Sequence, residues 1–343
     1  MGWKISVVLI IFLAACSKKN SGGTGGINPP PPGADTPIFK GADVSWLTQM
    51  ESQGIKFYNA AGTSTDCMQL LQSLGINSIR LRAWVNPAGG WNGTADLVTK
   101  AVRAHKLGMR VMIDFHYSDT WADPGHQTKP AAWASLSFNS LVDTVYGYTL
   151  AVLDTLKANG VVPSWVQVGN ETNDGMLWPE GRASVNMANF AALVNAGYRA
   201  VKAVNDSIRV IVHISNGYDN SLFRWMFDGL KANGAQYDII GMSLYPSTSN
   251  WQSYDQSCAV NMADMVSRYG KQVMISEVGM PADQASVCES FLSDLQSKTK
   301  AVTGGNGLGV FYWEPECYNN WQGYGLGAFD VSGHPTVAMN AFK

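Results

Sequence analysis

Residues 94–114 of the 343-residue chain read TADLVTKAVRAHKLGMRVMID, a helical pattern followed at once by a short strand pattern. Apolar side chains recur at helical spacing between residues 94 and 107, at Leu97, Val98, Ala101, Ala104 and Leu107. The next apolar run, 110–114, is short enough for a buried strand and ends on the charged residue Asp114. A helix that leads into a buried strand is the repeating unit of α/β folds, so the number of such units decides the fold.

The same alternation continues through the chain from residue 39 onward. Other helical patterns cover 138–158 and 185–204, and Gly160 and Gly270 fall where helices are expected to stop. Eight strands with helices between them predict a single (β/α)8 TIM barrel over residues 38–343, rather than a doubly wound sheet. We find no internal repeat and no second domain. The candidate strands are 39–43, 78–82, 110–114, 165–168, 209–213, 239–243, 272–276 and 309–312.

The composition excludes several classes of protein. Lys and Arg number 24 against 26 Asp and Glu, a formal net charge of −2, so we expect no nucleic-acid partner. Charged residues make up 15%, below the roughly 25% of an average domain, while 46% of residues are hydrophobic. Because apolar residues are plentiful and no fixed period runs through the sequence, disorder, collagen and coiled coil are excluded.

The first 37 residues have the composition of an export signal followed by a tether. Residues 1–15 resemble a signal peptide, with Lys4 before an apolar run that is too short to span a bilayer. The sequence Leu13-Ala-Ala-Cys16 resembles a bacterial lipobox and predicts lipidation of Cys16; an ordinary signal peptide with a chance cysteine is the alternative. Residues 16–37 are rich in Gly and Ser and then in Pro, as in a tether. Ser17, in place of Asp, favours the outer membrane or cell surface, with the lipid anchor as the only membrane contact.

The other four cysteines form no CxxC pair, so neither a zinc ribbon nor a thioredoxin-type site is indicated. Four cysteines allow three disulfide pairings. A Cys258–Cys288 bridge is favoured because both residues lie at or near the start of neighbouring late helices. The alternative is that the thiols are free. These four residues are Cys67, Cys258, Cys288 and Cys317.

Polar and aromatic residues follow nearly every predicted strand, where they would make a poor core. In a (β/α)8 barrel these positions gather at one rim, and active sites lie there. Together they would form a cleft rich in carboxylates and walled by aromatic rings, which suits a sugar chain. The candidate site residues are Asp43, Arg82, Trp84, Asn86, Asp114, His116, Asn170, Glu171, Asn173, His213, Tyr245, Glu277 and Trp313.

Glu171 and Glu277 are the candidates for glycoside hydrolysis with retention, which needs two carboxyls about 5–5.5 Å apart. They follow the fourth and seventh predicted strands and can point into one central space from opposite sides of the ring. Asn170 is placed to bind the sugar 2-hydroxyl. Arg82 and Tyr245 are candidates to keep Glu277 ionised, whereas Glu171 needs a less solvated site that raises its pKa. The structural alternatives are that Asn170-Glu171 is a common dipeptide without a catalytic role and that Glu277 is an ordinary salt-bridge partner.

The remaining candidates would bind sugar or orient loops. Trp84 and Trp313 directly follow strands and are candidate platforms for sugar rings, with packing as an equal alternative. His116 and His213 are candidates to bind hydroxyls, and because they lack a third partner at a recognised spacing we expect no zinc. Further tryptophan candidates are Trp121, Trp178 and Trp321, and further hydroxyl ligands or loop-orienting residues are Asp43, Asn86, Asp114 and Asp123.

Five segments resemble the endo-β-1,4-galactanases of glycoside hydrolase family 53. They are 41–46 (GADVSW), 114–126 (DFHYSDTWADPGH), 168–171 (VGNE), 177–181 (LWPEG) and 310–315 (VFYWEP). The similarity runs from residue 38 to the C-terminus, and the second segment is the most specific. The resemblance implies a (β/α)8 barrel, a retaining mechanism, and pectic β-1,4-galactan as substrate. We expect the site to need no cofactor. It also implies that Glu171 is the acid/base and Glu277 the nucleophile. We expect the chain to act as a monomer.

One segment departs from that family. Some bacterial members carry a long calcium-binding loop after the eighth strand, whereas the loop 313–329 is short here. It is too poor in carboxylates for a site that takes six to eight oxygen ligands, so we expect no metal. Two rival functions stay open: a β-glycanase of the same clan that acts on mannan, glucan or xylan, and a catalytically silent surface protein that binds galactan. The presence of both glutamates argues against the second.

Overall fold

The computed structural model describes residue 2 and residues 38–343, which include the whole segment predicted to be the barrel. Apart from Gly2, the predicted signal peptide, the lipidation site Cys16 and the tether lie outside the described residues. Among the described residues, no helix combines the length and the apolar character needed to cross a membrane.

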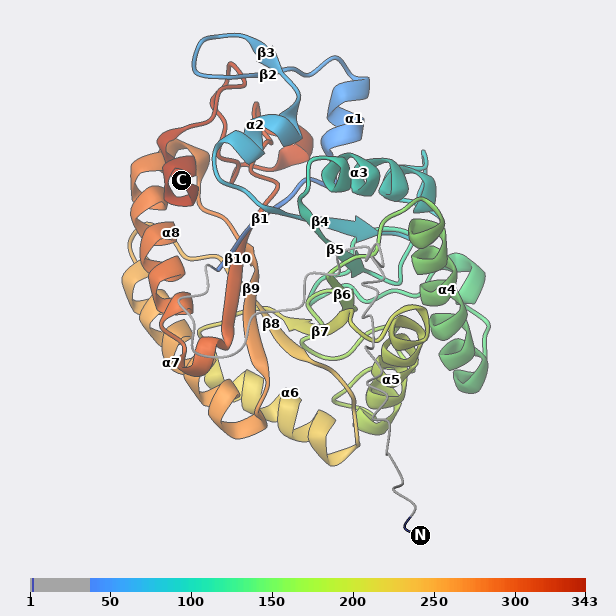
Figure 1. Ribbon diagram of the computed structural model, residues 1–343. Helices are drawn as coiled ribbons and strands as arrows, with labels where there is room; N and C mark the ends of the chain where they lie inside the picture. The colour runs from blue at the N-terminus through green and yellow to red at the C-terminus, as the bar shows by residue number, and fades with distance from the viewer. Residues whose placement is uncertain (1, 3–37) are drawn as a thin grey trace.

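Eight parallel strands form a closed barrel with helices around it (Figure 1). Their order is β1-β10-β9-β8-β7-β6-β5-β4, and β1 closes the ring by pairing with both β4 and β10. The eight predicted strands are all present, with ends shifted by at most two residues, which confirms the single (β/α)8 barrel. The strands are β1 (Phe39–Asp43), β4 (Ser78–Ala83), β5 (Arg110–Phe115), β6 (Trp165–Val168), β7 (Arg209–Ile214), β8 (Ile239–Leu244), β9 (Gln272–Val278) and β10 (Gly307–Trp313).

Helices connect the strands and surround the barrel. The three helices predicted from periodicity agree with α3, α4 and α5 to within two residues at each end. Periodicity did not predict the hairpin of β2 (Phe57–Tyr58) and β3 (Ser64–Thr65), because two-residue strands carry no repeating pattern. The helices are α1 (Leu47–Ser52), α2 (Cys67–Ser73), α3 (Thr94–Lys106), α4 (Phe138–Ala158), α5 (Met187–Val204), α6 (Asn220–Ala232), α7 (Trp251–Tyr269) and α8 (Ala285–Lys300). Short 3-10 turns lie at Ala131–Trp133, Ala282–Gln284, Thr303–Gly305, Trp321–Gly323 and Val337–Phe342.

Local signals in the sequence set where several helices begin and end. Asp66, Ser137 and Asn186 precede α2, α4 and α5, and each side chain accepts the backbone N–H of the residue three positions further on. Gly270 ends α7 in the left-handed conformation, with a φ of 62°, because glycine has no Cβ to clash there. These caps fix the points at which the chain turns back toward the next strand.

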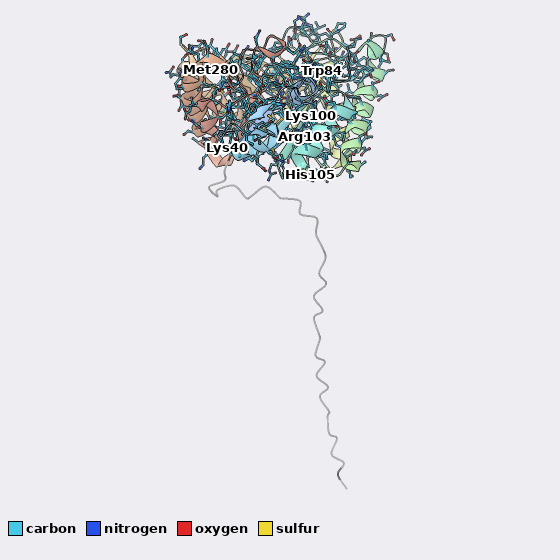
Figure 2. All side chains as sticks on the ribbon, turned by 90° about the horizontal axis from the view of Figure 1, so that it is seen from above. Lys40, Trp84, Lys100, Arg103, His105 and Met280 are labelled. Atoms are coloured by element: carbon cyan, nitrogen blue, oxygen red, sulfur yellow. The ribbon has the colours of Figure 1, made fainter. Side chains whose placement is uncertain are left out.

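The interior of the barrel has an apolar part and a polar part. Toward the amino ends of the strands, a buried cluster fills the space with Met112, Trp165, Ile211, Ile239, Met274 and Phe311. Toward the carboxyl ends, the buried side chains are charged or polar, among them Arg80, Arg82, Asp114, Gln167 and His213. Figure 2 shows the two ends from the side: Trp84 and Met280, which follow β4 and β9, lie at one end, and Lys40 and His105 lie at the other. The polar interior therefore faces the rim that carries the predicted site.

The four described cysteines are buried and free, so the predicted Cys258–Cys288 disulfide is wrong and the free-thiol alternative holds. Cys258 on α7 packs against the turn after β7, where its Sγ lies 3.0 Å from the place that a Cβ on Gly217 would take. Cys288 on α8 contacts β10 instead, with its Sγ 3.7 Å from the Tyr312 hydroxyl. The two helices turn their thiols toward different strands.

Candidate active site

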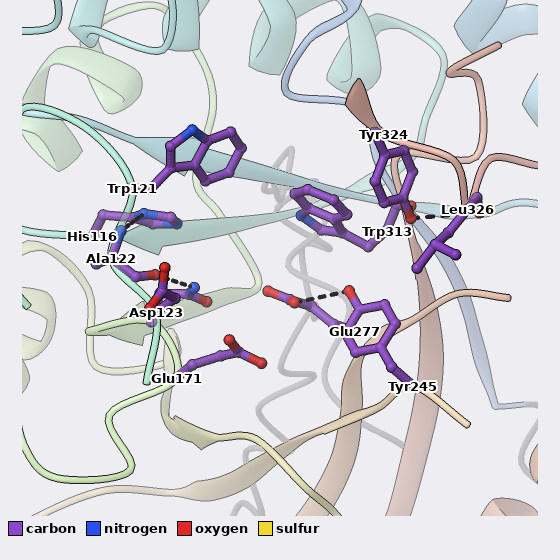
Figure 3. Close-up of a pocket in the computed structure, with 11 residues that line it drawn as sticks. His116, Trp121, Ala122, Asp123, Glu171, Tyr245, Glu277, Trp313, Tyr324 and Leu326 are labelled. Carbon is purple, nitrogen blue, oxygen red and sulfur yellow. Dashed lines mark hydrogen bonds between the residues drawn. The ribbon is translucent and has the colours of Figure 1, made fainter. Parts of the chain in front are cut away.

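A cleft of about 280 Å³ opens at the carboxyl end of the barrel (Figure 3). Glu171, which follows β6, and Glu277 of β9 face it from different walls. The rings of Trp121 and Trp313 lie across the space from the two carboxyl groups in Figure 3. The full lining is His116, Trp121, Ala122, Asp123, Asn170, Glu171, Tyr245, Glu277, Trp313, Tyr324 and Leu326.

Glu277 is held by a cation and a hydroxyl. Its Oε1 lies 2.7 Å from a guanidinium nitrogen of Arg80, and its Oε2 accepts a hydrogen bond of 3.0 Å from the Tyr245 hydroxyl. The Tyr245 contact agrees with the expectation from the sequence. The expectation for Arg82 is wrong, because Arg82 pairs with Glu314 at 2.8 Å. The two arginines share a face of β4, since side chains two residues apart on a strand point the same way, but they end at different depths.

Arg80 is the centre of a buried network beneath the cleft. Its guanidinium also donates to Asp43 at 2.7 Å, to Asp114 at 2.9 Å, to Gln167 at 2.8 Å and to Asn170 at 2.9 Å. Burial by itself lowers the pKa of Arg80, but the surrounding carboxylates outweigh that effect and raise the pKa. Arg80 is therefore a permanent cation below the cleft, fixed in position by its partners.

Glu171 stands at a sharp turn in the chain. Its backbone is left-handed, with a φ of 42°, a conformation that is uncommon for residues with a Cβ and concentrates at functional sites. Its Oε1 accepts a hydrogen bond of 2.6 Å from the Ser243 hydroxyl of β8. The preceding Asn170 is fixed as well, since its amide nitrogen donates to the Ala122 carbonyl at 2.8 Å. The turn therefore presents an acid and an amide to the cleft side by side.

The surroundings of the two glutamates decide which one carries the proton. Burial raises the pKa of Glu171 to about 7, against the lowering effects of the Ser243 hydrogen bond and of Arg80. Burial also raises the pKa of Glu277 to about 8; Arg80 opposes this rise and the negative charge of Glu171 adds to it. Two interacting acids titrate as a pair, so one negative charge is shared between them near neutral pH. Taken singly, Glu277 has the higher pKa of the two. However, only Glu277 contacts Arg80 and Tyr245, and these contacts stabilise its ionised form. The charge therefore lies on Glu277 and the proton on Glu171.

The structure divides the other predicted site residues into three groups. Six line the cleft: His116, Trp121, Asp123, Asn170, Tyr245 and Trp313. Four lie beneath it and are at most 1% exposed, which contradicts direct contact with a sugar: Asp43, Arg82, Asp114 and His213. Asp43, Asp114 and His213 direct their polar groups to buried partners instead, and Arg82 directs one nitrogen to Glu314. Three others are absent from the lining: Trp84, Asn86, which is exposed, and Asn173, whose amide donates to Ser215 at 2.7 Å.

A second hollow of about 380 Å³ adjoins the cleft and shares Trp121 and Tyr324 with it. The Arg82 guanidinium lies 5.0, 5.1 and 4.3 Å from the ring centres of Trp46, Trp84 and Trp121, within range for cation–π attraction. Arg82 therefore supports an aromatic wall rather than a carboxylate of the cleft. The hollow is lined by Trp46, Gln49, Trp84, Ala88, Trp91, Trp121, Gln322, Gly323 and Tyr324, so the candidates Trp178 and Trp321 lie outside both spaces.

A second pair of glutamates lies in the turn after β10. Glu314 accepts hydrogen bonds from Arg82 at 2.8 Å and from the Trp46 backbone N–H at 3.2 Å. Glu314 and Glu316 are both 0% exposed, and a carboxyl oxygen of each lies within 4.8 Å of the other. Two buried negative charges so close together repel each other, so one of the two carboxyls keeps its proton. Burial, and then the charge of Glu314, raises the pKa of Glu316 well above its ordinary value. Glu316 is therefore the protonated member of the pair.

Within residues 38–343, one group offers three possible metal ligands close together, namely Glu314, Glu316 and Cys317. Their three ligand atoms are fewer than the six to eight oxygens that calcium takes. The guanidinium of Arg82 on Glu314 also repels a cation. The arrangement fits one protonated carboxyl better than a metal ion.

Sequence reasoning missed several residues of the site. Arg80 and Ser243 lie within the predicted strands, and the rule that alternate residues share a face places Arg80 beside Arg82 in the barrel interior. Glu316 follows Glu314 by two residues in the same turn. Tyr324 and Leu326 carried no signal, because the turn after β10 has no period from which its path could be inferred.

Known proteins share this fold and much of this sequence. Residues 39–290 match the family model of glycosyl hydrolase family 53. The chain is 36% identical over 344 residues to an uncharacterized protein in the bgaB 5' region of Niallia circulans, covering 88% of this chain and 93% of that one. It is 33% identical over 335 residues to the arabinogalactan endo-beta-1,4-galactanase of Thermothelomyces thermophilus, covering 89% and 98%. A solved structure of a fungal beta-1,4-galactanase superposes with a TM-score of 0.83 at 29% identity, over 90% of this chain and 99% of that one. This chain therefore belongs to glycosyl hydrolase family 53.

Proposed function

We propose that this chain is a retaining endo-β-1,4-galactanase that cuts internal β-1,4-galactosidic bonds of pectic type I arabinogalactan. One observation carries the chemistry: Glu171 and Glu277 face the same cleft, and of the two only Glu277 is paired with a cation. Retention needs one ionised and one protonated carboxyl at the scissile bond. The choice of galactan rests on relatives that are named arabinogalactan endo-beta-1,4-galactanases.

In the first step the Glu277 carboxylate attacks the anomeric carbon, and Glu171 gives its proton to the leaving glycosidic oxygen. The products are a galactosyl ester of Glu277 and a shortened chain with a free 4-hydroxyl. Arg80 and Tyr245 keep Glu277 charged and aimed until the bond forms. Glu171 begins this step protonated because burial raises its pKa.

In the second step water attacks the same carbon and Glu277 leaves as a carboxylate. Esterification has removed the negative charge of Glu277, which lowers the pKa of Glu171 and suits it to take a proton from that water. Two displacements at one carbon restore the original β configuration. Glu171 is thereby returned to its protonated state for the next cycle.

Asn170 and the aromatic rings would position the sugar. One amide hydrogen of Asn170 is used by the Ala122 carbonyl, so the second is left for the 2-hydroxyl at the cleaved residue. Trp121 and Trp313 offer ring surfaces across the cleft from the carboxyls, on which the apolar face of galactose can pack. The walls are rigid because these rings pack on each other, with centres 5.8 Å apart.

We also propose that the chain is exported and held at the outer membrane or cell surface by a lipid on Cys16, as its first 37 residues indicate. Its substrate is a polymer, and a surface anchor with a tether would let the barrel reach it. Radiolabelled palmitate should enter the wild-type chain and not the Cys16→Ala variant. Equal labelling of both would contradict the anchor.

Incubation of the purified chain with linear β-1,4-galactan tests the function. We expect mid-length galacto-oligosaccharides early in the reaction, with the new reducing ends first released in the β configuration by NMR. Products from mannan, glucan or xylan and none from galactan would favour the clan-related glycanase. Binding of galactan without new reducing ends would favour the silent binding protein.

A further inference from the structure

The Ser243 hydroxyl connects the acid Glu171 to a buried imidazole. Ser243 Oγ lies 2.6 Å from Oε1 of Glu171 and 2.8 Å from Nε2 of His213. Ser243 is 1% exposed and His213 is 0% exposed, and neither lines the cleft. These two residues therefore touch no substrate, and any effect they have on the reaction passes through Glu171.

A hydroxyl has one hydrogen, so Ser243 can donate to Glu171 only if Nε2 of His213 carries a hydrogen and donates to Oγ. The contacts of the other ring nitrogen agree with that tautomer. Two donors face Nδ1 of His213: the side-chain amide of Gln167 at 3.0 Å and the backbone N–H of Glu171 at 3.5 Å. Nδ1 is therefore the acceptor of the ring.

The orientation of Gln167 supports the same assignment. Its Oε1 accepts from Arg80 at 2.8 Å, and one amide hydrogen goes to Asp114 at 2.9 Å, so the second hydrogen has Nδ1 of His213 as its partner. Asn170 Oδ1 also lies 3.0 Å from Nδ1 and could accept from the other tautomer, but it does not need that hydrogen because it has a donor in Arg80. A hydrogen on Nδ1 would leave the buried Gln167 amide hydrogen unpaired, which is the costlier arrangement.

The ring of His213 is also neutral. Burial, and after it the charge of Arg80, lowers the pKa of His213 well below its ordinary value. A neutral ring with its hydrogen on Nε2 can direct the Ser243 hydroxyl without adding a charge beside Glu171. The charged and titratable groups that face Glu171 are Arg80 from β4, Asp114 from β5, Asp123 from the loop after it, His213 from β7, Tyr245 after β8 and Glu277 from β9.

We propose that Ser243, directed by the Nε2–H tautomer of His213, is a positioning residue that holds Glu171 and favours its ionised form in the step in which it acts as a base. The inference rests on the proposed galactanase function. Under this proposal, His213 of β7 and Ser243 of β8 affect the reaction through Glu171 and not by contact with the sugar.

Ser243→Ala should move the basic limb of the kcat/KM profile to higher pH, because Glu171 loses a donor that stabilises its charge. The acidic limb should stay where it is. The value of kcat should fall by roughly ten- to a hundredfold with KM nearly unchanged, which is the loss expected when a hydrogen bond to a charged group is removed. Ser243→Thr keeps the hydroxyl and should restore the limb. Ser78→Ala is the matched control, since Ser78 is a buried serine at the amino end of β4, away from the cleft, and its hydroxyl donates to Asn77.

A fall in rate with the basic limb unmoved would overturn the proposal. NMR tests it without substrate: the 15N signals of His213 should show Nε2 protonated and Nδ1 bare, and the carboxyl titration of Glu171 should move to higher pH in Ser243→Ala. The opposite tautomer, or an unchanged titration, would also overturn it. If galactan is not cleaved but both NMR results hold, the contacts of Ser243 stand and the proposed substrate fails.

Discussion

Two pairs of buried glutamates lie at the carboxyl end of this barrel, and each is tied to an arginine of β4. Glu171 and Glu277 lie by Arg80, and Glu314 and Glu316 lie by Arg82. Burial raises carboxyl pKa values in both pairs. The pairs differ in access, because the first lines an open cleft and the second is 0% exposed. A raised pKa and a nearby cation are therefore common to both pairs, and only the open cleft distinguishes the pair that we propose to be catalytic.

The sealed pair has a structural task. Glu314 fixes Arg82, and Arg82 in turn lies against the rings of Trp46, Trp84 and Trp121. Removal of either member should therefore change stability first and chemistry second. Removal of a member of the open pair should do the reverse, and this contrast can be measured.

The largest effect is expected for Glu277→Ala, which removes the proposed nucleophile. Galactan hydrolysis should fall by about 10⁴-fold or more, while galactan binding and the unfolding midpoint change little. Reducing-end assays measure the loss of hydrolysis, and isothermal titration with galacto-oligosaccharides measures binding. Substantial residual turnover would show that the open pair does not carry the chemistry.

Glu171→Ala should depend on the leaving group. Turnover of galactan should fall by roughly 10²- to 10⁴-fold, whereas an activated aryl galactoside chain should be partly spared in the first step, because a good leaving group needs no proton. Azide should restore rate on the aryl substrate by replacing the water that needs a base. Equal loss on both substrates would reverse the assignment of roles within the pair.

Glu314→Gln should act on stability. It leaves Arg82 buried without its carboxylate, and breaking one side of a buried ion pair costs about 3–5 kcal/mol. Urea unfolding followed by tryptophan fluorescence measures the loss, and kcat on galactan at a temperature where the variant is folded should stay within about tenfold of the wild type. A stable but inactive variant would erase the difference between the two pairs.

The smallest effect is expected for Glu316→Gln, and it should depend on pH. The folded pKa of Glu316 lies above its unfolded value, so its contribution to stability is complete below about pH 4 and is lost as pH rises through the folded pKa. Glutamine cannot ionise, so the variant should match the wild type at acid pH and lose less stability toward alkaline pH. Unfolding midpoints across a pH series check this, and parallel curves for both proteins would mean that Glu316 is not the protonated partner.

The sequence predicted the barrel and both glutamates of the open pair, because helix and strand periods and strand-end positions are local properties. It assigned the wrong arginine to Glu277, since Arg80 and Arg82 share a face of β4 and their depth depends on the tilt of the whole barrel. Burial of Asp43, Asp114 and His213 likewise depends on side chains from other strands. The disulfide prediction failed for the same reason, because sequence spacing does not say which way α7 and α8 turn their thiols.

The four free cysteines of this barrel can serve as built-in reporters of its unfolding. Burial raises the pKa of each thiol, so a reagent that reacts with thiolate has almost no target in the closed protein. Cys67 and Cys317 lie near the sealed pair, as the influence of Glu316 on both thiols shows, whereas Cys258 and Cys288 belong to α7 and α8. Mass spectrometry after timed alkylation can therefore follow unfolding near the sealed pair and at α7 and α8 in the same molecule, with no engineered probe.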